Sequence, residues 1–248
     1  MKVRKLVLIS ASVASLLAGS SAAEAASTYV SIFGGATILQ QPGLRGTSHT
    51  RYYSTYTFSS KQSVDTSFKT GFVVGGNWGV DWGSFRTEIE AAYHGNKSGK
   101  TGRVTTTYQG GYIGGPVFTS SAKDAIEPVN LRLNAYSLMA NVWYDFHDFE
   151  QSLGGVTPYV GAGVGLAQIQ IGGSINNVKL IEKNDFTFAW QVGAGVSVPV
   201  LDNVKFFVDY RYFAADGANL KINPGYHGGD VKADFDSHEL LVGFRIKA

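Results

Sequence analysis

Eight segments of the chain alternate hydrophobic and polar residues with a period of two, the pattern of β-strands that have two unlike faces. Each segment has about 11–16 residues, whereas a soluble strand usually has about 5–6 and a tilted membrane strand needs about 9–11. In one of them Phe85 and Ile89 share a face, and Arg86 and Glu90 share the other. The predicted strands cover residues 28–39, 68–78, 84–95, 132–146, 156–171, 185–199, 204–214 and 235–247.

The connections between these segments alternate between short and long. The short ones cover residues 79–83, 147–155 and 201–203, and the long ones cover residues 40–67, 96–131, 172–184 and 215–234. Such sorting is typical of outer-membrane barrels, whose short turns face the periplasm and whose long loops face outward. The pattern therefore predicts an all-β fold, an eight-stranded antiparallel up-and-down transmembrane β-barrel.

One of the long connections carries a strand pattern of its own. Val104, Thr106 and Tyr108 alternate before Gly110 and Gly111. This spacing predicts a hairpin that extends the third and fourth strands above the membrane, with its turn at the two glycines.

Glycines indicate which face of the strands lines the barrel. Gly161, Gly163 and Gly165 alternate in the fifth strand, and Gly193 and Gly195 alternate in the sixth, on the same faces as polar residues. Glycine weakens a strand that is exposed to solvent, but inside a narrow lumen it leaves room for large side chains from facing strands. We therefore expect the polar faces inside and the apolar faces against lipid.

The charged residues support this orientation. An Arg or Lys at mid-membrane costs about 2–4 kcal/mol on the lipid face. Reversing the third and seventh strands would expose six charges, at a cost on the order of 10 kcal/mol, comparable to a stability of about 5–15 kcal/mol. We interpret the inward charges as a salt-bridged plug, with an ion path as the alternative, because an eight-stranded barrel is only wide enough for its own side chains. The predicted lumen network is Lys69, Arg86, Glu88, Glu90, Lys205, Asp209, Arg211, Glu239 and Arg245.

Aromatic residues gather near the ends of the predicted strands. Two girdles at the headgroup levels are expected of such a barrel, and the alternative is the ordinary aromatic content of a sheet. Those near the short turns are Trp78, Trp82, Phe85, Trp143, Tyr144, Phe146, Tyr159 and Phe206. Those near the long loops are Phe68, Tyr93, Phe186, Phe188, Tyr210 and Tyr212.

The first 25 residues have the features of a secretory signal. Met1–Lys5 is basic, Leu6–Ala18 is an apolar stretch of 13 residues, and Ala23–Ala25 has the small-x-small pattern of a cleavage site. We expect residues 1–25 to be removed and residues 26–248 to form the barrel domain. Removal takes three of 21 basic and one of 19 acidic residues, which leaves 18 of each. A neutral mature chain indicates no nucleic-acid partner.

Composition narrows the class of protein further. The 248 residues include 31 glycines and no cysteine, which excludes a disulfide scaffold, a thiolate zinc site and a cysteine-linked lipoprotein. The mature chain has no apolar run approaching 18 residues, so no membrane-spanning helix is predicted.

Four of the strands resemble a known family. Thr157–Ala167, Phe188–Val196, Leu201–Tyr212 and His238–Arg245 look like the last four strands of opacity-type, OmpA-like outer-membrane barrels of the porin family. The resemblance covers about residues 156–248 and implies a surface antigen of a Gram-negative outer membrane, inserted by the barrel-assembly machinery. Members serve as surface antigens, and some as adhesins or small pores.

The resemblance departs at the last residues. Such barrels usually end in an aromatic residue that the assembly machinery reads, whereas this sequence ends Ile246-Lys247-Ala248. We therefore expect an internal assembly signal or inefficient insertion. No peptidoglycan-binding domain is expected after the eighth strand.

Catalytic and metal-binding patterns are weak. The five histidines have no metal-ligand spacing, and we expect no metal and no cofactor. Ser237, His238 and Glu239 cannot converge, because neighbours on a strand point to opposite faces. Glu88, Glu90 and His94 share one face and could form a hydrolytic site with a serine from elsewhere, a minor alternative to the expectation of no enzyme activity.

The long loops are the best candidates for a binding function. They carry basic residues that could pair with lipopolysaccharide phosphates at the outer rim, although a solvated loop is an equal alternative. We predict a structural and antigenic barrel in outer-membrane lipid whose loops contact lipopolysaccharide or a host or partner surface. A small diffusion pore and a lipid-modifying enzyme remain as alternatives, with a soluble eight-stranded ligand binder outside them. The candidate lipopolysaccharide contacts are Arg45, Arg51, Lys97, Lys100 and Arg103.

Overall fold

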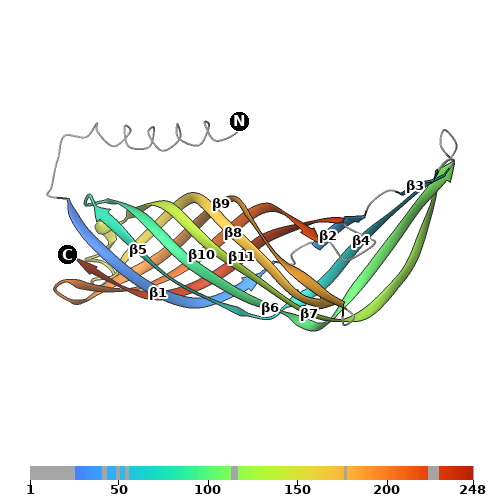
Figure 1. Ribbon diagram of the computed structural model, residues 1–248. Helices are drawn as coiled ribbons and strands as arrows, with labels where there is room; N and C mark the ends of the chain where they lie inside the picture. Colours follow the sequence, from blue (N-terminus) through green and yellow to red (C-terminus); the bar gives the residue numbers. More distant parts are fainter. Residues whose placement is uncertain are drawn as a thin grey trace, which may run out of the picture.

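Eight long antiparallel strands close into a barrel in the computed structural model (Figure 1). Closure comes from β1, which pairs with β5 along one edge and with β11 along the other. The predicted fold class is thereby confirmed. The barrel strands are β1 (Ser27–Leu39), β5 (Gly71–Asp81), β6 (Phe85–Tyr112), β7 (Val117–Asp145), β8 (Thr157–Ile175), β9 (Val178–Leu201), β10 (Val204–Ile222) and β11 (Gly229–Lys247). The structure describes residues 26–40, 44–48, 51–53, 56–112, 117–175, 178–222 and 229–247.

Both ends of the described chain lie at the end of the barrel that has the short connections. Tyr29 pairs with Lys247, and Ser27 pairs with Asp81 beside the short β5–β6 turn. The β7–β8 connection holds the one helical element of the described residues, the 3-10 turn η1 (His147–Phe149). No helix in this part of the chain is long and apolar enough to cross a membrane. The predicted signal peptide lies outside the described residues and stays a prediction.

The sheet continues beyond the barrel at the opposite end. Three further strands, β2 (Leu44–Ser48), β3 (Arg51–Tyr53) and β4 (Tyr56–Phe68), join it there. β4 pairs with the distal half of β6, and β2 pairs with β11. The ends of β6 and β7 therefore project well past the barrel wall, together with β3 and β4 (Figure 1).

Much of what the sequence predicted as long loops is therefore strand. The prediction of loops at residues 40–67, 96–131, 172–184 and 215–234 is wrong for most of their length, because their backbone groups continue the ladders of the barrel. The hairpin above the third and fourth strands is confirmed, but its turn is not at Gly110–Gly111. Those glycines are still paired, with Phe118 and Val117.

The second predicted strand is displaced by three residues. Residues 68–78 were expected, whereas Phe68 ends β4 and the barrel strand begins at Gly71. Lys69 and Thr70 between them are exposed. The local pattern hid this break, because both strands alternate and only their partners on β6 distinguish them.

The barrel strands turn their charged faces inward. Arg211 and Glu90 are each 2% exposed, whereas Val192 is 45% and Leu240 is 57% exposed on the outer wall. Burying charge in the lumen and exposing aliphatic side chains is the reverse of a soluble barrel and suits a lipid environment.

The lumen also contains an apolar core that the alternation pattern did not predict. Towards the projecting end, inward residues of β7, β8, β10 and β11 pack into a buried cluster that includes Leu133, Ile169, Phe213 and Phe235. The side chains that fill the barrel are packed like a protein interior. The described lumen is thus polar in one part and apolar in another.

Glycines make room for the largest lumen side chains. A Cβ at Gly161 would overlap the ring of Trp143. One at Gly195 would overlap the carboxylate of Asp209, and one at Gly193 would lie 3.0 Å from Cγ of Arg211. The alternating glycines of β8 and β9 therefore leave space for bulky residues of facing strands.

We expect Gly161→Val to destabilise the barrel by about 1–3 kcal/mol or more, because the added methyl groups cannot share space with Trp143. Ala162→Val is the matched control, since Ala162 is exposed on the outer face of the same strand. Urea unfolding in vesicles, followed by migration of unboiled protein on gels, measures both. Equal midpoints for the two variants would contradict the packing described here.

Candidate functional site

The polar part of the lumen is organised around two buried arginines. Arg86 forms a bidentate contact with Asp145, in which Nε donates to Oδ2 at 2.7 Å and Nη2 donates to Oδ1 at 2.9 Å. Its Nη1 donates to Glu88 at 2.9 Å. Arg211 binds Glu90 at 2.7 Å and Asp209 at 2.6 Å. All of these side chains are at most 4% exposed. Each arginine thus contacts two carboxylates from within a closed space.

Neutral side chains complete the hydrogen bonding of these carboxylates. Glu88 accepts hydrogen bonds from the Tyr29 hydroxyl at 2.6 Å and from Nε1 of Trp143 at 3.0 Å. Glu90 accepts from the amides of Asn141 at 3.1 Å and Gln191 at 3.3 Å. A buried charge pair is tolerated only when its remaining hydrogen-bonding groups are satisfied. Together with the contacts of Arg211, these hydrogen bonds tie β1, β6, β7, β9 and β10 together across the lumen.

The two remaining charged residues deep in the lumen have other partners. Arg245 is 7% exposed, and its guanidinium lies over the rings of Tyr29 at 5.2 Å and Phe207 at 5.7 Å. Glu239 accepts from His94 at 2.7 Å rather than from an arginine. Of the predicted network, the structure places Arg86, Glu88, Glu90, Asp209, Arg211, Glu239 and Arg245 in the lumen.

One predicted member of the network lies elsewhere, and another has the inward parity of its strand at the periplasmic edge of the lumen. Lys69 is a correction: it is exposed in the junction between β4 and β5, where its backbone N–H donates to the Lys97 carbonyl at 2.9 Å. Lys205 is half-buried near the periplasmic turn. There a hydrogen bond from His147, together with the charge of Lys205, holds the pKa of the Glu150 carboxyl below its ordinary value.

Several buried polar residues were missed by the sequence analysis, and Trp143 and Tyr159 were misplaced. Both were predicted in the girdle near the short turns, but each is 2% exposed inside the lumen. Tyr159 donates to Asp209 there. On β7, Trp143 lies two residues from Asn141, and on β8, Tyr159 lies two residues from Gly161, so each shares a strand face with an inward residue. This alternation could have predicted that both aromatic side chains point into the lumen. His94 was placed on the inward face with Glu88 but not in the network, and the missed lumen residues are Tyr29, Ser137, Asn141, Asp145, Gln191 and Ser237.

His94 forms a hydrogen-bonded row that superficially resembles a hydrolase site. Its Nδ1 lies 2.7 Å from Glu239, and its Nε2 lies 3.2 Å from Oγ of Ser137. The ring is stacked on Phe213 at 4.6 Å and meets the edge of Phe235 at 5.8 Å. A nucleophile must reach a substrate carbonyl, whereas this serine is buried beside an apolar cluster. We therefore interpret the hydrogen-bonded row of Glu239, His94 and Ser137 as a structural part of the lumen.

The hydrolytic arrangement considered from the sequence is not assembled. Glu88 and Glu90 bind the two arginines and do not contact His94. Within the described part of the chain, no group of three His, Asp or Glu side chains is arranged to hold a metal ion.

The outer wall shows aromatic side chains at two levels. Near the projecting end Tyr93 contacts Phe72 at 5.6 Å and Tyr136 at 4.9 Å. Near the short turns Tyr144 contacts Phe85 at 4.9 Å. Such belts are expected where a barrel wall meets the two membrane interfaces.

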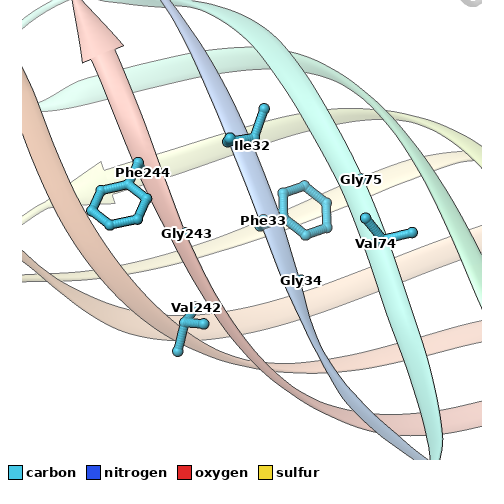
Figure 2. A pocket seen from close by; sticks show the side chains of 8 residues that line it. All are labelled: Ile32, Phe33, Gly34, Val74, Gly75, Val242, Gly243 and Phe244. Carbon is cyan, nitrogen blue, oxygen red and sulfur yellow. The ribbon is translucent and has the colours of Figure 1, made fainter.

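Between the belts, the described part of the wall carries a shallow apolar depression. Gly34 lacks a side chain at an outward position of β1, and Ile32, Val74, Val242 and Phe244 surround it (Figure 2). Its walls are aliphatic and aromatic carbon at the level of the acyl chains. The depression is part of the lipid-facing surface.

Of the predicted lipopolysaccharide contacts, the structure describes the side chain of Lys97, which is exposed on the outer face of β6. The side chains of Arg45, Arg51, Lys100 and Arg103 lie outside the described residues. Their backbones belong to β2, β3 and the distal part of β6. They remain predicted contacts.

We expect Arg211→Met to destabilise the barrel by about 3–5 kcal/mol, because Glu90 and Asp209 would remain buried without their cation. Lys205→Met is the control, since Lys205 is half-buried outside this pair of contacts. Urea unfolding in vesicles measures the difference. Adding Glu90→Gln to Arg211→Met should recover part of the lost stability, because one of the two unpaired carboxylates is removed. An Arg211→Met variant that unfolds at the same urea concentration as the unchanged chain would contradict the network.

The chain resembles known outer-membrane proteins. It is 28% identical over 171 residues to the outer membrane protein PagN of Salmonella typhimurium, which covers 64% of this chain and 63% of that protein. It is 30% identical over 111 residues to the 25 kDa outer-membrane immunogenic protein of Brucella abortus, 45% of each chain. The chain thus matches less than two thirds of the length of these relatives.

Solved structures with similar arrangements include two small barrels. Neisserial surface protein A is 22% identical, with 91% of this chain and 100% of that chain covered and a TM-score of 0.47. OprG from Pseudomonas aeruginosa is 12% identical, with 90% and 96% covered and a TM-score of 0.48.

The named relatives and the inward-charged barrel place the chain in the outer membrane of a Gram-negative bacterium. The opacity-type and OmpA-like barrels that the sequence resembles are a less specific assignment than the family whose model matches the chain. The model of the surface antigen family matches residues 14–236, and the chain belongs to that family.

Proposed function

We propose that this surface antigen is a closed, non-conducting barrel that displays a β-sheet extension for contact with a ligand outside the cell. The barrel-assembly machinery inserts it, and outer-membrane lipid surrounds it. The observation that carries the proposal is the continuation of β6 and β7 far beyond the barrel, where β3 and β4 join them (Figure 1).

The length of these strands supports a display role. β6 has 28 residues and β7 has 29, whereas about 9–11 suffice to cross hydrocarbon. More than half of each strand is therefore beyond the need of membrane crossing. A sheet of several strands also holds its surface residues in a fixed arrangement, which lowers the entropy lost on binding.

The lumen supports the absence of conduction. The arginine–carboxylate contacts fill the polar part, and the cluster around Phe213 and Phe235 fills another. An ion path needs continuous water, and an eight-stranded barrel has room only for its own side chains. The charged residues therefore serve stability rather than permeation.

The ligand of the extension is proposed at the level of its chemistry. Arg51 and Arg103 lie on strands of the extension, and Arg45 lies on β2 beside it, so an anionic surface suits it. The ligand is then lipopolysaccharide or an anionic host or partner surface. The description of the family, surface antigen, and the name of one relative, an immunogenic protein, support exposure of the protein outside the cell.

We expect the purified chain to show no discrete conductance steps in planar bilayers, because the described lumen is filled by paired side chains. An 8-stranded barrel known to conduct, added to the same bilayer, serves as the positive control. Reproducible single-channel steps that scale with added protein would favour the diffusion pore instead.

We expect cells that express the chain to bind epithelial monolayers, and a variant with residues 103–126 replaced by an Asn-Gly turn to lose that binding. Gly102 and Glu127 are directly paired, so a two-residue turn can close the shortened hairpin. Heat-modifiable migration on gels verifies that the shortened barrel inserts. Undiminished binding by the inserted variant would contradict a role for the extension.

A further inference from the structure

The outer face of the β6–β7 ladder changes its chemistry in a regular order towards the projecting end. Ile89 is paired with Ala140, and Tyr93 is paired with Tyr136. Four residues further along β6, Lys97 is paired directly with Arg132. Aliphatic, aromatic and cationic pairs thus follow one another along a single column of the wall.

This order places the cationic pair at the level of lipid headgroups. Four residues at about 3.4 Å each carry the strand about 14 Å past the Tyr93–Tyr136 pair, and a tilt of about 35–45° reduces the rise to about 10 Å. Aromatic belts lie at the membrane interface. The cations therefore lie just outside the acyl chains, where the phosphates of an outer-leaflet glycolipid are held.

A third cation lies beside the pair. The backbone N–H of Lys69 donates to the carbonyl of Lys97, so the two residues are immediate neighbours across the β4–β5 junction and β6. The side chains of Lys69, Lys97 and Arg132 are all exposed. Three positive charges therefore gather on one side of the barrel.

The described surroundings provide no acidic partner for this group. From β4 to β8, the described outward neighbours of the group are Ser67, Phe72, Tyr93, Gly95, Gly99, Asn130, Asn134, Tyr136, Gln168, Gln170, Gly172 and Ser174, none of which is acidic. Like charges directly opposite each other on paired strands are destabilising. Lys97 and Arg132 are thus arranged for an anion from outside the chain.

On the opposite wall, formed by β10 and β11, a polar side chain at the rim is hydrogen-bonded within the chain. There His238 is bonded to the Tyr210 hydroxyl at 2.6 Å and to the Gln40 amide at 2.7 Å. Its polar atoms are used within the chain. Among the described side chains at this level, the cationic group lies on the β4–β7 side, whereas His238 on the opposite side is bonded within the chain.

The wall below the cations offers a floor for the same ligand. A Cβ at Gly95 would come within 2.9 Å of the Phe72 ring, so the missing side chain lets this ring lie over β6. Phe72, Tyr93 and Tyr136 then form a continuous aromatic surface. Gly172 on β8 pairs with Arg132 and adds no side chain beside it.

We propose that Lys69, Lys97 and Arg132 form a site for a phosphate group of lipid A, with the glycolipid lying against the aromatic floor of Phe72, Tyr93 and Tyr136. The planar guanidinium of Arg132 can bind two phosphate oxygens, and the two ammonium groups supply point charges. The site deepens the proposed function by naming a lipid partner, but it lies on the barrel wall and not on the displayed extension.

The test uses the full chain in phosphatidylcholine nanodiscs, titrated with bisphosphorylated lipid A and followed by native mass spectrometry. We expect Lys97→Gln combined with Arg132→Gln to weaken binding at least tenfold, since both charge-assisted hydrogen-bond donors to the phosphate are removed. Lys247→Gln, an exposed cation at the periplasmic end, should bind like the unchanged chain.

Two further measurements separate charge recognition from general adhesion of lipid. Dephosphorylated lipid A should bind the unchanged chain about as weakly as the double variant binds the phosphorylated form, and raising salt should narrow the difference. Equal binding of the two lipids, or equal binding by chain and double variant, would overturn the site.

The same assay on the chain lacking residues 103–126 distinguishes this site from the proposed function. Lys69, Lys97 and Arg132 remain in that variant, so it should keep lipid A binding while it loses cell adhesion. Cell adhesion that persists in this variant would contradict only the role of the extension and leave the lipid A site untouched. Loss of lipid A binding by this inserted variant would overturn the site as located here.

Discussion

The structure depends on the pairing of buried charge inside a barrel whose outer wall meets hydrocarbon. Lipid cannot solvate Arg86 or Arg211, so both point inward, where water is also excluded by packed side chains. A buried guanidinium group that has no water around it requires carboxylates within hydrogen-bonding distance. Asp145 and Glu88 meet the first arginine, and Glu90 and Asp209 meet the second. The inward orientation of these charged residues follows from this requirement.

The volume of the lumen imposes a second condition on the same residues. Two arginines, Trp143 and Tyr159 occupy the polar part. The two rings meet edge to face, and guanidinium groups lie over them, with Arg211 5.1 Å from the centroid of Trp143. Space for them comes from positions such as Gly161 and Gly195 on the neighbouring strands. Charge pairing and glycine placement are thus one arrangement. It fills the polar part of the described lumen with paired side chains.

The outside of the barrel has two regions with distinct chemistry. The extension of β3, β4, β6 and β7 carries backbone ladders beyond the membrane and presents a stable sheet to the medium. Below it, Lys97 and Arg132 form a cationic pair just above the aromatic level. A surface antigen that contacts an external ligand with the first region and holds its lipid with the second would be oriented firmly in the outer leaflet.

The sequence by itself determined the class of fold, the number of barrel strands and the inward direction of the charges. Period-two alternation is local, so the parity of Arg86, Glu90 and Arg211 can be read without knowing any partner. The alternating glycines of β8 and β9 likewise pointed to large side chains opposite them.

Only the tertiary structure decided which strands pair and where they end. Lys69 was assigned to the lumen because the break between β4 and β5 has no local signal, and the partners of the two strands on β6 define it. Trp143 and Tyr159 were assigned to a girdle because an aromatic side chain suits a membrane interface and a lumen equally well. The pairing of Lys97 with Arg132 joins residues 35 positions apart. Such contacts depend on the register of two strands, which no single strand contains.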